Sequence, residues 1–214
     1  MLRFSRTGRA GFSPTQFIDN LGSYAMDVVG KSLPSSLMLF TSHVLFWPTL
    51  LWNEFLVRSS GGSLQWSNQV YVSPATGGKL FLGGFPWRPE ILNSLELSGV
   101  HSVLSVVDER EAKLPRHFRS FRVPMRDFAQ PDLNKVQEAV EIVRSEIAAG
   151  RSVYLHCKAG KGRSATVGLC FLLQQKQAKT PEEAAAILRT ARPQILGNIG
   201  TRRVVSKFFS TLNS

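Results

Sequence analysis

One nine-residue run, His156–Ser164 (HCKAGKGRS), most constrains how this chain can fold. It follows the apolar segment Ser152–Leu155 and leads directly into the apolar stretch Ala165–Gln175. The pattern predicts a buried strand, a turn with two glycines and a helix, since glycines let several backbone N–H groups converge on one anion at a helix N-terminus. The run therefore indicates an α/β domain that binds an oxyanion at the end of a strand.

The rest of the chain beyond residue 64 alternates strand and helix patterns. Apolar residues from Val136 to Ile147 repeat at the helical spacing, and Thr180 with Pro181 and Glu183 forms a capping box that starts another helix. Together these patterns predict a central, mostly parallel sheet flanked by helices. Strands are expected at Lys79–Leu82, Val100–Val107, Phe118–Val123 and Ser152–Leu155, and further helices at Ala165–Gln175, from Pro181 to just before Pro193, and at about Thr201–Leu212.

The residue types in the run predict a reaction as well as a fold. A thiol among backbone donors and an arginine has a lowered pKa, so Cys157 is the expected nucleophile toward phosphorus. Arg163 offers a planar fork that matches two phosphoryl oxygens, and Ser164 is placed to donate to the sulfur. His156 is expected to support the loop rather than act as a base. The remaining candidate phosphate-binding residues are Lys158, Ala159, Gly160, Lys161 and Gly162.

The run HCKAGKGRS resembles the HCxxGxxR[ST] loop of the Cys-based protein tyrosine and dual-specificity phosphatases, and the similarity covers about residues 65–212. It is most similar to the mitochondrial branch that dephosphorylates phosphatidylglycerophosphate. LFLGGFP, the acidic run DERE at 108–111, Arg163–Thr166 and Pro181–Ala184 carry that likeness. The resemblance implies a dual-specificity phosphatase-like fold and a phosphomonoester hydrolase that needs no metal or cofactor. It also implies phosphatidylglycerophosphate as substrate, on the route to cardiolipin.

Two other substrates stay open. HCKAGKGR is also similar to the loop of the phosphatase and tensin homologue, in which the two loop lysines contact extra phosphates of an inositol ring, so Lys158 and Lys161 are candidates for that role. A phosphoprotein is the third candidate. The formal net charge of +11 suits an anionic partner. The segment after Cys157 contains ten Lys or Arg and two acids, so it carries +8 of this net charge. An anionic phospholipid is the expected partner, and nucleic acid is not expected.

The resemblance also implies a general acid, normally an aspartate some thirty residues before the cysteine. Asp127 and Asp132 are the candidates, and Asp127 is preferred because it follows the Phe118–Val123 strand, whereas Asp132 is placed to cap a helix. The acids of the DERE run, Asp108, Glu109 and Glu111, are interpreted as solvated loop residues. Cys170 is expected to lie in the core.

The first residues resemble a mitochondrial presequence. Arg3, Arg6 and Arg9 precede the first acid, Asp19, and an Arg- and Ser-rich segment without acids is typical of such targeting peptides. Residues 1–30 are therefore expected to direct the chain to the mitochondrion. Taken together with the family resemblance, they predict a location at the inner mitochondrial membrane.

An uncharged segment follows. The 22 residues between Lys31 and Glu54 are long enough to cross a bilayer as a helix, although Pro34 and Pro48 weaken one. A span, a helix in the membrane interface and packing on the catalytic domain all remain open for residues 31–58. Ser59–Ser63 is the expected linker, so the phosphatase domain is predicted to cover residues 59–214.

Overall fold

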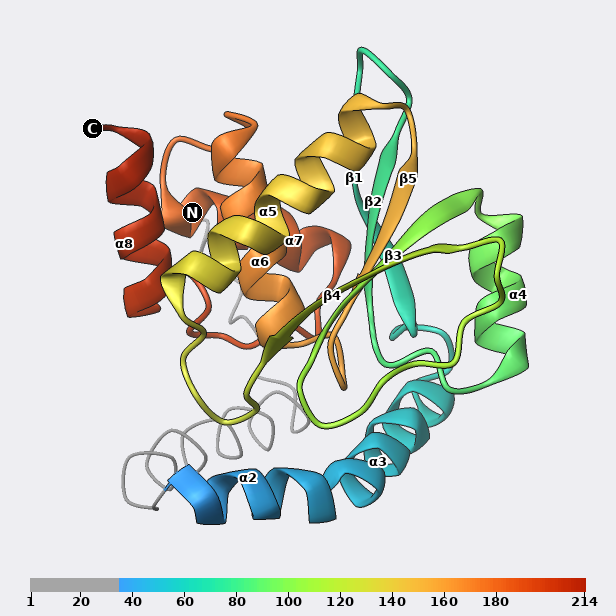
Figure 1. The fold of residues 1–214 in the computed structure, drawn as a ribbon. Coiled ribbons are helices and arrows are strands. Elements are labelled where there is room, and N and C mark those ends of the chain that lie inside the picture. The colour runs from blue at the N-terminus through green and yellow to red at the C-terminus, as the bar shows by residue number, and fades with distance from the viewer. Residues whose placement is uncertain (1–34) are drawn as a thin grey trace, which may run out of the picture.

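The computed structural model describes residues 35–214, so the expected presequence lies outside the described residues. Five strands form one sheet, and helices lie on both of its faces and across one of its ends (Figure 1). The elements are α2 (Ser35–Val44), α3 (Phe46–Ser59), β1 (Ser67–Val72), β2 (Lys79–Gly83), α4 (Pro89–Leu97), β3 (Val100–Val107), β4 (Arg119–Met125), α5 (Leu133–Ala148), β5 (Ser152–His156), α6 (Arg163–Gln174), α7 (Pro181–Ala191) and α8 (Arg203–Leu212).

The sheet has the strand order β1-β2-β5-β3-β4. β1 pairs antiparallel with β2, whereas every other neighbouring pair is parallel. β5 lies in the middle and all five of its residues are buried, as expected of a strand covered on both faces. The prediction of a mostly parallel sheet flanked by helices is confirmed.

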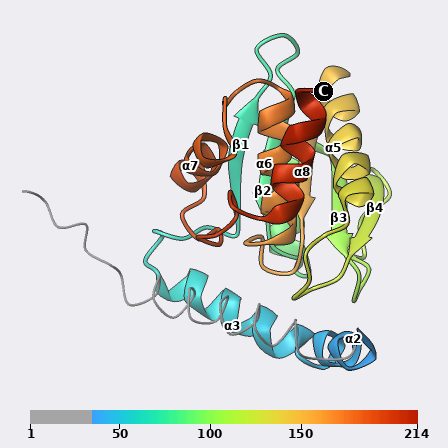
Figure 2. The same cartoon turned by 90° about the vertical axis from the view of Figure 1, so that its left-hand side faces the viewer.

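The two faces of the sheet are covered unequally. α5, α6, α7 and α8 pack on one face and enclose the larger hydrophobic core, which is the layer that Figure 2 shows in front of the strands. α4 covers the other face with a smaller core of Phe81, Leu95, Val100, Val103, Phe118 and Tyr154. The fold is therefore a three-layer α/β arrangement with most of its core on the α6 side.

Two elements were missed by the sequence patterns. β1 is an edge strand whose residues are mostly half-exposed, so it lacks a continuous apolar run. α4 has only nine residues, and Leu95 is the one residue of this helix that is fully buried. The helix is therefore too short to show the apolar repeat of a helical period. β4 extends to Met125, past Pro124, because it lies at the edge of the sheet, where a missing N–H is tolerated.

Both predicted helix caps are present. The Asp132 carboxylate accepts a 2.8 Å hydrogen bond from the Asn134 N–H, and the Thr180 hydroxyl accepts one from the Glu183 N–H at 3.2 Å. The Glu183 carboxylate reaches back to the N–H of Lys179, one residue before the cap, rather than to that of Thr180. The capping box is thus present with its second bond shifted by one residue.

The uncharged N-terminal segment forms two consecutive helices, α2 and α3. Pro48 has no N–H to donate to Val44, which explains the break between them. Phe46 and Leu50 of α3 belong to the main hydrophobic core, so this side of α3 packs on the catalytic domain, as the third alternative expected. Among the described residues, no helix combines the length and the apolar character that crossing a bilayer requires.

The parallel strands bring their carboxyl ends to one edge of the sheet. β5 ends at His156, β2 at Gly83, β3 at Val107 and β4 at Met125. Loops that follow parallel strands meet at this edge, which is where open α/β sheets place their ligand sites. The candidate site residues lie in the loops after β4 and β5 and in the first turn of α6.

Candidate active site

Residues Cys157–Gly162 join the end of β5 to the first residue of α6, and we call this segment the cysteine loop. Within it, Gly160 has a φ of +70°, the left-handed region that favours glycine. A Cβ atom on Gly160 would lie 2.5 Å from the backbone of Gly83 and 2.5 Å from the Arg192 guanidinium. Only glycine therefore fits here, where the loop packs against the end of β2.

The Cys157 thiol is buried in this loop and is surrounded by donors. Its Sγ accepts hydrogen bonds from the Gly160 N–H and from the Ser164 hydroxyl, each at 3.3 Å. Burial alone would raise the pKa of the thiol, but the charge of Arg163 and the hydrogen bonds from Ser164 outweigh burial and lower it. A cysteine with a lowered pKa supplies the thiolate that acts as a nucleophile.

Arg163 is the first residue of α6 and its side chain is buried beside the thiol. One terminal nitrogen donates to the Glu109 carboxylate at 2.7 Å and to the carbonyl of Met125, the last residue of β4, at 2.9 Å. The other terminal nitrogen lies 3.3 Å from Asp127 Oδ1 without hydrogen-bond geometry. That nitrogen and Nε find no hydrogen-bond partner among the described residues, and they form the pair of donors that matches two phosphoryl oxygens.

Glu109 corrects one sequence interpretation. It was expected to be a solvated loop acid, but its side chain is only 1% exposed and forms the ion pair with Arg163. Its carboxylate also accepts the N–H of Asp108 at 3.1 Å. Glu111 is exposed and Asp108 is half-buried, so the prediction holds for Glu111 alone. Burial against Arg163 is a tertiary contact that the run DERE gives no sign of.

Asp127 lies in the loop after β4, between two cations. Lys158 Nζ is 2.5 Å from Asp127 Oδ2, and the same ammonium lies 4.9 Å from the centre of the Phe128 ring. Burial would raise the pKa of the Asp127 carboxyl, but Arg163 and Lys158 outweigh burial and lower it. Asp132, the other candidate acid, is exposed and caps α5. The structure brings Asp127, and not Asp132, to the thiol and the arginine.

The two remaining candidates from the sequence behave as structural residues. His156 is buried with its ring against Tyr154 and Phe85, at centroid distances of 5.7 Å each. Burial lowers the pKa of His156 to about 4, so its imidazole is neutral at neutral pH. Cys170 lies in the core on α6, and burial raises the pKa of its thiol, which fits the expected core cysteine.

Arg192 supports the cysteine loop and was missed by the sequence analysis. It is buried, and it donates to the Gly160 carbonyl at 2.8 Å and to the Ala159 carbonyl at 3.2 Å. On its other side it donates to the Asn68 side chain at 2.6 Å, which ties the loop to β1. Burial lowers the pKa of Arg192 to about 10. One arginine before a proline in a basic chain carries no signal that would reveal this role.

Lys161 and Gly162 of the cysteine loop contact the segment after α7. The Lys161 carbonyl accepts the Leu196 N–H at 3.0 Å, so the loop is also held from the segment after α7. A Cβ atom on Gly162 would lie 3.2 Å from the Leu196 side chain, which makes this position tight. Hydrogen bonds to Ala159, Gly160 and Lys161 thus fix the backbone of the loop before any ligand binds.

The chain is similar in sequence to known phosphatases over most of its length. The model of the dual specificity phosphatase catalytic domain matches residues 80–211. Phosphatidylglycerophosphate phosphatase PTPMT2 of Arabidopsis thaliana is 32% identical over 174 residues, which cover 77% of this chain and 72% of that protein. Human phosphatidylglycerophosphatase and protein-tyrosine phosphatase 1 is 26% identical over 186 residues, covering 81% of this chain and 88% of that protein.

Solved structures show the same fold. A crystal structure of PTPMT1 in complex with PI(5)P has a TM-score of 0.59 at 22% identity and covers 70% of this chain and 97% of that chain. A variant of human DUSP28 has a TM-score of 0.57 at 24% identity, covering 68% of this chain and 96% of that chain. At these identities the likeness concerns the fold alone.

Proposed function

The chain belongs to the dual specificity phosphatase family and is a Cys-dependent phosphatase, and we propose that it converts phosphatidylglycerophosphate to phosphatidylglycerol. The chemistry rests on one observation: a buried thiol with a lowered pKa lies beside Ser164 and Arg163 and accepts the Gly160 N–H. The substrate is suggested by relatives that are named for it.

In the first step, the Cys157 thiolate attacks phosphorus and an S–P bond forms as the P–O bond to the glycerol breaks. Two phosphoryl oxygens bind to Arg163, one at Nε and one at the outer terminal nitrogen, which is the nitrogen that lies next to Asp127. The N–H groups of the cysteine loop stabilise the negative charge that develops on the phosphoryl oxygens. Asp127 donates its proton to the departing alkoxide. Phosphatidylglycerol leaves, and the phosphoryl group remains on the sulfur.

In the second step, water attacks the phosphorus of the cysteinyl phosphate and the S–P bond breaks. Asp127, now ionised, accepts a proton from that water and so returns to its starting form. The Ser164 hydroxyl, 3.3 Å from Sγ, donates to the departing thiolate and stabilises it. The products are inorganic phosphate and the thiolate enzyme.

The two cations beside Asp127 set when this group can act as an acid. With both cations free of substrate, the pKa of Asp127 is lowered, so the carboxyl is ionised. A bound phosphoryl dianion neutralises Arg163, which raises the pKa of Asp127 and lets it carry a proton in the complex. Lys158 remains as the second cation and keeps that pKa down.

Replacing Asp127 with asparagine is expected to lower kcat about 10²- to 10⁴-fold on an alkyl phosphate, because the leaving alkoxide then receives no proton. The rate on an activated aryl phosphate, whose phenolate leaves unprotonated, should fall far less.

Lys158→Met removes a cation from beside the Asp127 carboxyl and so raises the pKa of that carboxyl. The basic limb of the kcat profile should therefore move to higher pH, because Asp127 then keeps its proton up to a higher pH.

Steady-state rates across the pH range on both phosphates test this assignment. The exposed Lys179 provides the matched control, because Lys179→Met removes the same charge outside the site and should leave the basic limb in place. An Asp127→Asn enzyme with an unchanged rate on the alkyl phosphate would show that Asp127 is not the acid.

The substrate itself is tested by phosphate release from the full chain. We expect kcat/KM to be highest on phosphatidylglycerophosphate, by at least about tenfold over phosphatidylinositol phosphates in matched vesicles and over a phosphotyrosine peptide. A preference for any of the phosphatidylinositol phosphates would replace this proposal with the second candidate, and a preference for the peptide with the third.

A phosphoinositide is the second candidate because the fold matches a PTPMT1 structure that contains PI(5)P. By the resemblance, Lys158 and Lys161 were candidates for contacts to extra ring phosphates. Lys158 is instead buried and paired with Asp127, so contact with a ring phosphate would require breaking that ion pair. This arrangement argues against an inositol ring that carries phosphates in addition to the one hydrolysed.

We further propose a mitochondrial location at the inner membrane. The support is the Arg-rich, acid-free composition of the first 18 residues, together with the proposed lipid substrate. Fractionation of cells that express the tagged chain, with carbonate extraction, would show the compartment and how the protein is held there. Recovery with the cytosol would refute this location.

A further inference from the structure

Large apolar side chains are exposed along one side of α2 and α3. Phe40 is 67% exposed, Trp52 56% and Phe55 58%. Of eleven exposed large hydrophobic residues in the described part of the chain, eight lie between positions 37 and 55, so they form one surface rather than scattered single residues. We call this surface the apolar face: Leu37, Phe40, Val44, Leu45, Trp47, Leu51, Trp52 and Phe55.

The apolar face is not a by-product of packing on the domain. α3 already buries Phe46 and Leu50 on its inner side, where they join the main core. Leu51, Trp52 and Phe55 point away from that core. A helix that is apolar on both sides needs a second apolar environment. The side chains of the described residues do not provide one, because these three remain about half-exposed.

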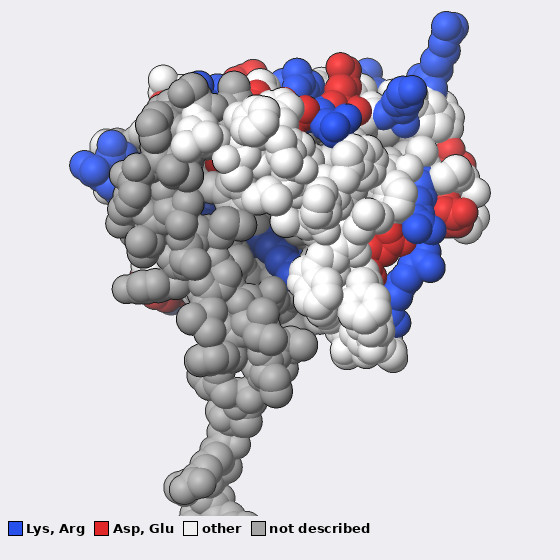
Figure 3. Space-filling view, turned by 90° about the horizontal axis from the view of Figure 1, so that it is seen from below, with Lys and Arg blue, Asp and Glu red and all other residues white. Residues whose placement is uncertain are grey.

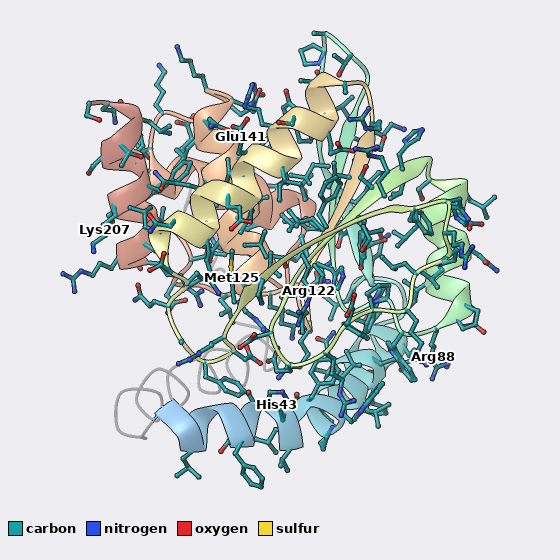
Figure 4. All side chains as sticks on the ribbon, in the orientation of Figure 1. His43, Arg88, Arg122, Met125, Glu141 and Lys207 are labelled. Carbon is teal, nitrogen blue, oxygen red and sulfur yellow. The ribbon has the colours of Figure 1, made fainter. Side chains whose placement is uncertain are left out.

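Aromatic rings and arginines border the apolar face. The Arg110 guanidinium lies 5.2 Å from the Trp47 ring centre, and Arg88 lies 4.4 Å from that of Trp87. Glu54 carries one negative charge between Arg58, at 2.9 Å, and Arg88, at 3.0 Å, so this part of the border keeps a positive charge. Figure 4 shows Arg88 beside the ends of α3 and α4. Trp and Arg are the residues that suit the boundary between lipid tails and anionic headgroups.

The apolar face and the cysteine loop share one side of the molecule. Phe46 of α3 packs on Phe85 at 5.3 Å, and Phe85 packs on His156 at 5.7 Å. The Phe85 N–H also donates to the Lys158 carbonyl at 2.9 Å. Figure 3 views this side and shows an extended uncharged surface. A planar partner that covers the apolar face would therefore lie on the side of the molecule where α3 and the cysteine loop are in contact through Phe85.

We propose that the apolar face docks the enzyme on a bilayer that contains anionic phospholipid, with α2 and α3 lying in the interface rather than crossing it. The choice of a bilayer over a protein rests on the proposed lipid substrate, the positive border and the length of the surface along two consecutive helices. The docked enzyme takes its phosphorylated headgroup from the surface without extracting the lipid into water.

Cosedimentation of the full chain with vesicles tests the proposal. The vesicles contain phosphatidylcholine alone or equal parts phosphatidylcholine and phosphatidylglycerol. The double variant Trp52→Glu/Phe55→Glu is expected to lower the partition coefficient about 10- to 100-fold on the mixed vesicles, because two rings no longer enter the interface. Trp52→Ala/Phe55→Ala adds no charge and should lose binding to both kinds of vesicle.

Leu97→Glu is the matched control. Leu97 is 90% exposed but stands at the far end of α4 from Arg88, so this charge should leave vesicle binding unchanged. All variants should hydrolyse a small soluble aryl phosphate at the rate of the unmodified chain, since none of these residues touches the cysteine loop. That assay reports folding and chemistry separately from the lipid panel, so a wrong substrate and a wrong docking surface give different results.

Two outcomes would overturn the proposal. One is that both double variants sediment with vesicles as well as the unmodified chain does. The other is that the unmodified chain is a dimer in size-exclusion chromatography with light scattering and the double variants are monomers with unchanged vesicle binding. The apolar face would then be an interface between two copies of the chain.

Discussion

Replacing Cys157 with serine is expected to abolish phosphate release while leaving the fold in place. The hydroxyl of serine stays protonated at neutral pH, whereas Arg163 and Ser164 lower the pKa of the thiol and supply a thiolate. Because every step of the proposed reaction passes through the S–P bond, kcat should fall at least about 10⁴-fold. The measurement is phosphate release from an aryl phosphate and from the lipid.

Two control measurements make this result specific to the nucleophile. Cys170→Ala removes the other cysteine from the core and should keep most of the activity, since Cys170 takes no part in the site. The thermal unfolding midpoint of Cys157→Ser should stay close to that of the unmodified chain. Substantial turnover by Cys157→Ser, after contaminating phosphatase is removed, would disprove the covalent route.

Replacing Arg163 with lysine is expected to lower kcat/KM about 10²- to 10³-fold, although the charge is kept. Lysine offers one compact ammonium in place of a fork. It cannot hold Glu109 and Met125 with one nitrogen while it presents two further donors to a phosphoryl group. We also expect the lysine charge to lie farther from the sulfur and to lower the pKa of Cys157 less, which should move the acid limb of the kcat/KM profile to higher pH.

The exposed Arg144 is the control for this substitution. It pairs with Glu141 on the surface of α5, and Arg144→Lys should leave both kcat/KM and the acid limb unchanged. Full activity in Arg163→Lys would mean that the fork geometry is unimportant and that a point charge is sufficient. The roles given to Nε and to the outer terminal nitrogen would then be wrong.

The buried polar groups around Arg163 could not be predicted from the sequence. Glu109 stands in a run of charged residues, and such a run is usually solvated; its burial depends on the end of β3 meeting the start of α6. Lys158 was expected to face the substrate, but the loop after β4 brings Asp127 within 2.5 Å of its ammonium. Each of these contacts joins residues on different loops, and neither partner's neighbours in the chain reveal the other.

Features that depend on neighbours in the chain could be predicted without coordinates. A buried strand, a glycine turn and a helix follow from local sterics and apolar spacing, so β5, the cysteine loop and α6 were predicted together with Cys157, Arg163 and Ser164 as candidates. The caps at Asp132 and Thr180 are local for the same reason.

Features that depend on strand order and on packing between distant elements needed the three-dimensional structure. The order β1-β2-β5-β3-β4 brings the loops after β3 and β4 next to the cysteine loop, which places Glu109 and Asp127 beside Arg163. Packing of Phe46 and Leu50 into the core also fixes which side of α3 is left exposed. Apolar residues on both sides of a helix look alike in a sequence, and only contact with the rest of the fold distinguishes the buried side from the side left for a partner.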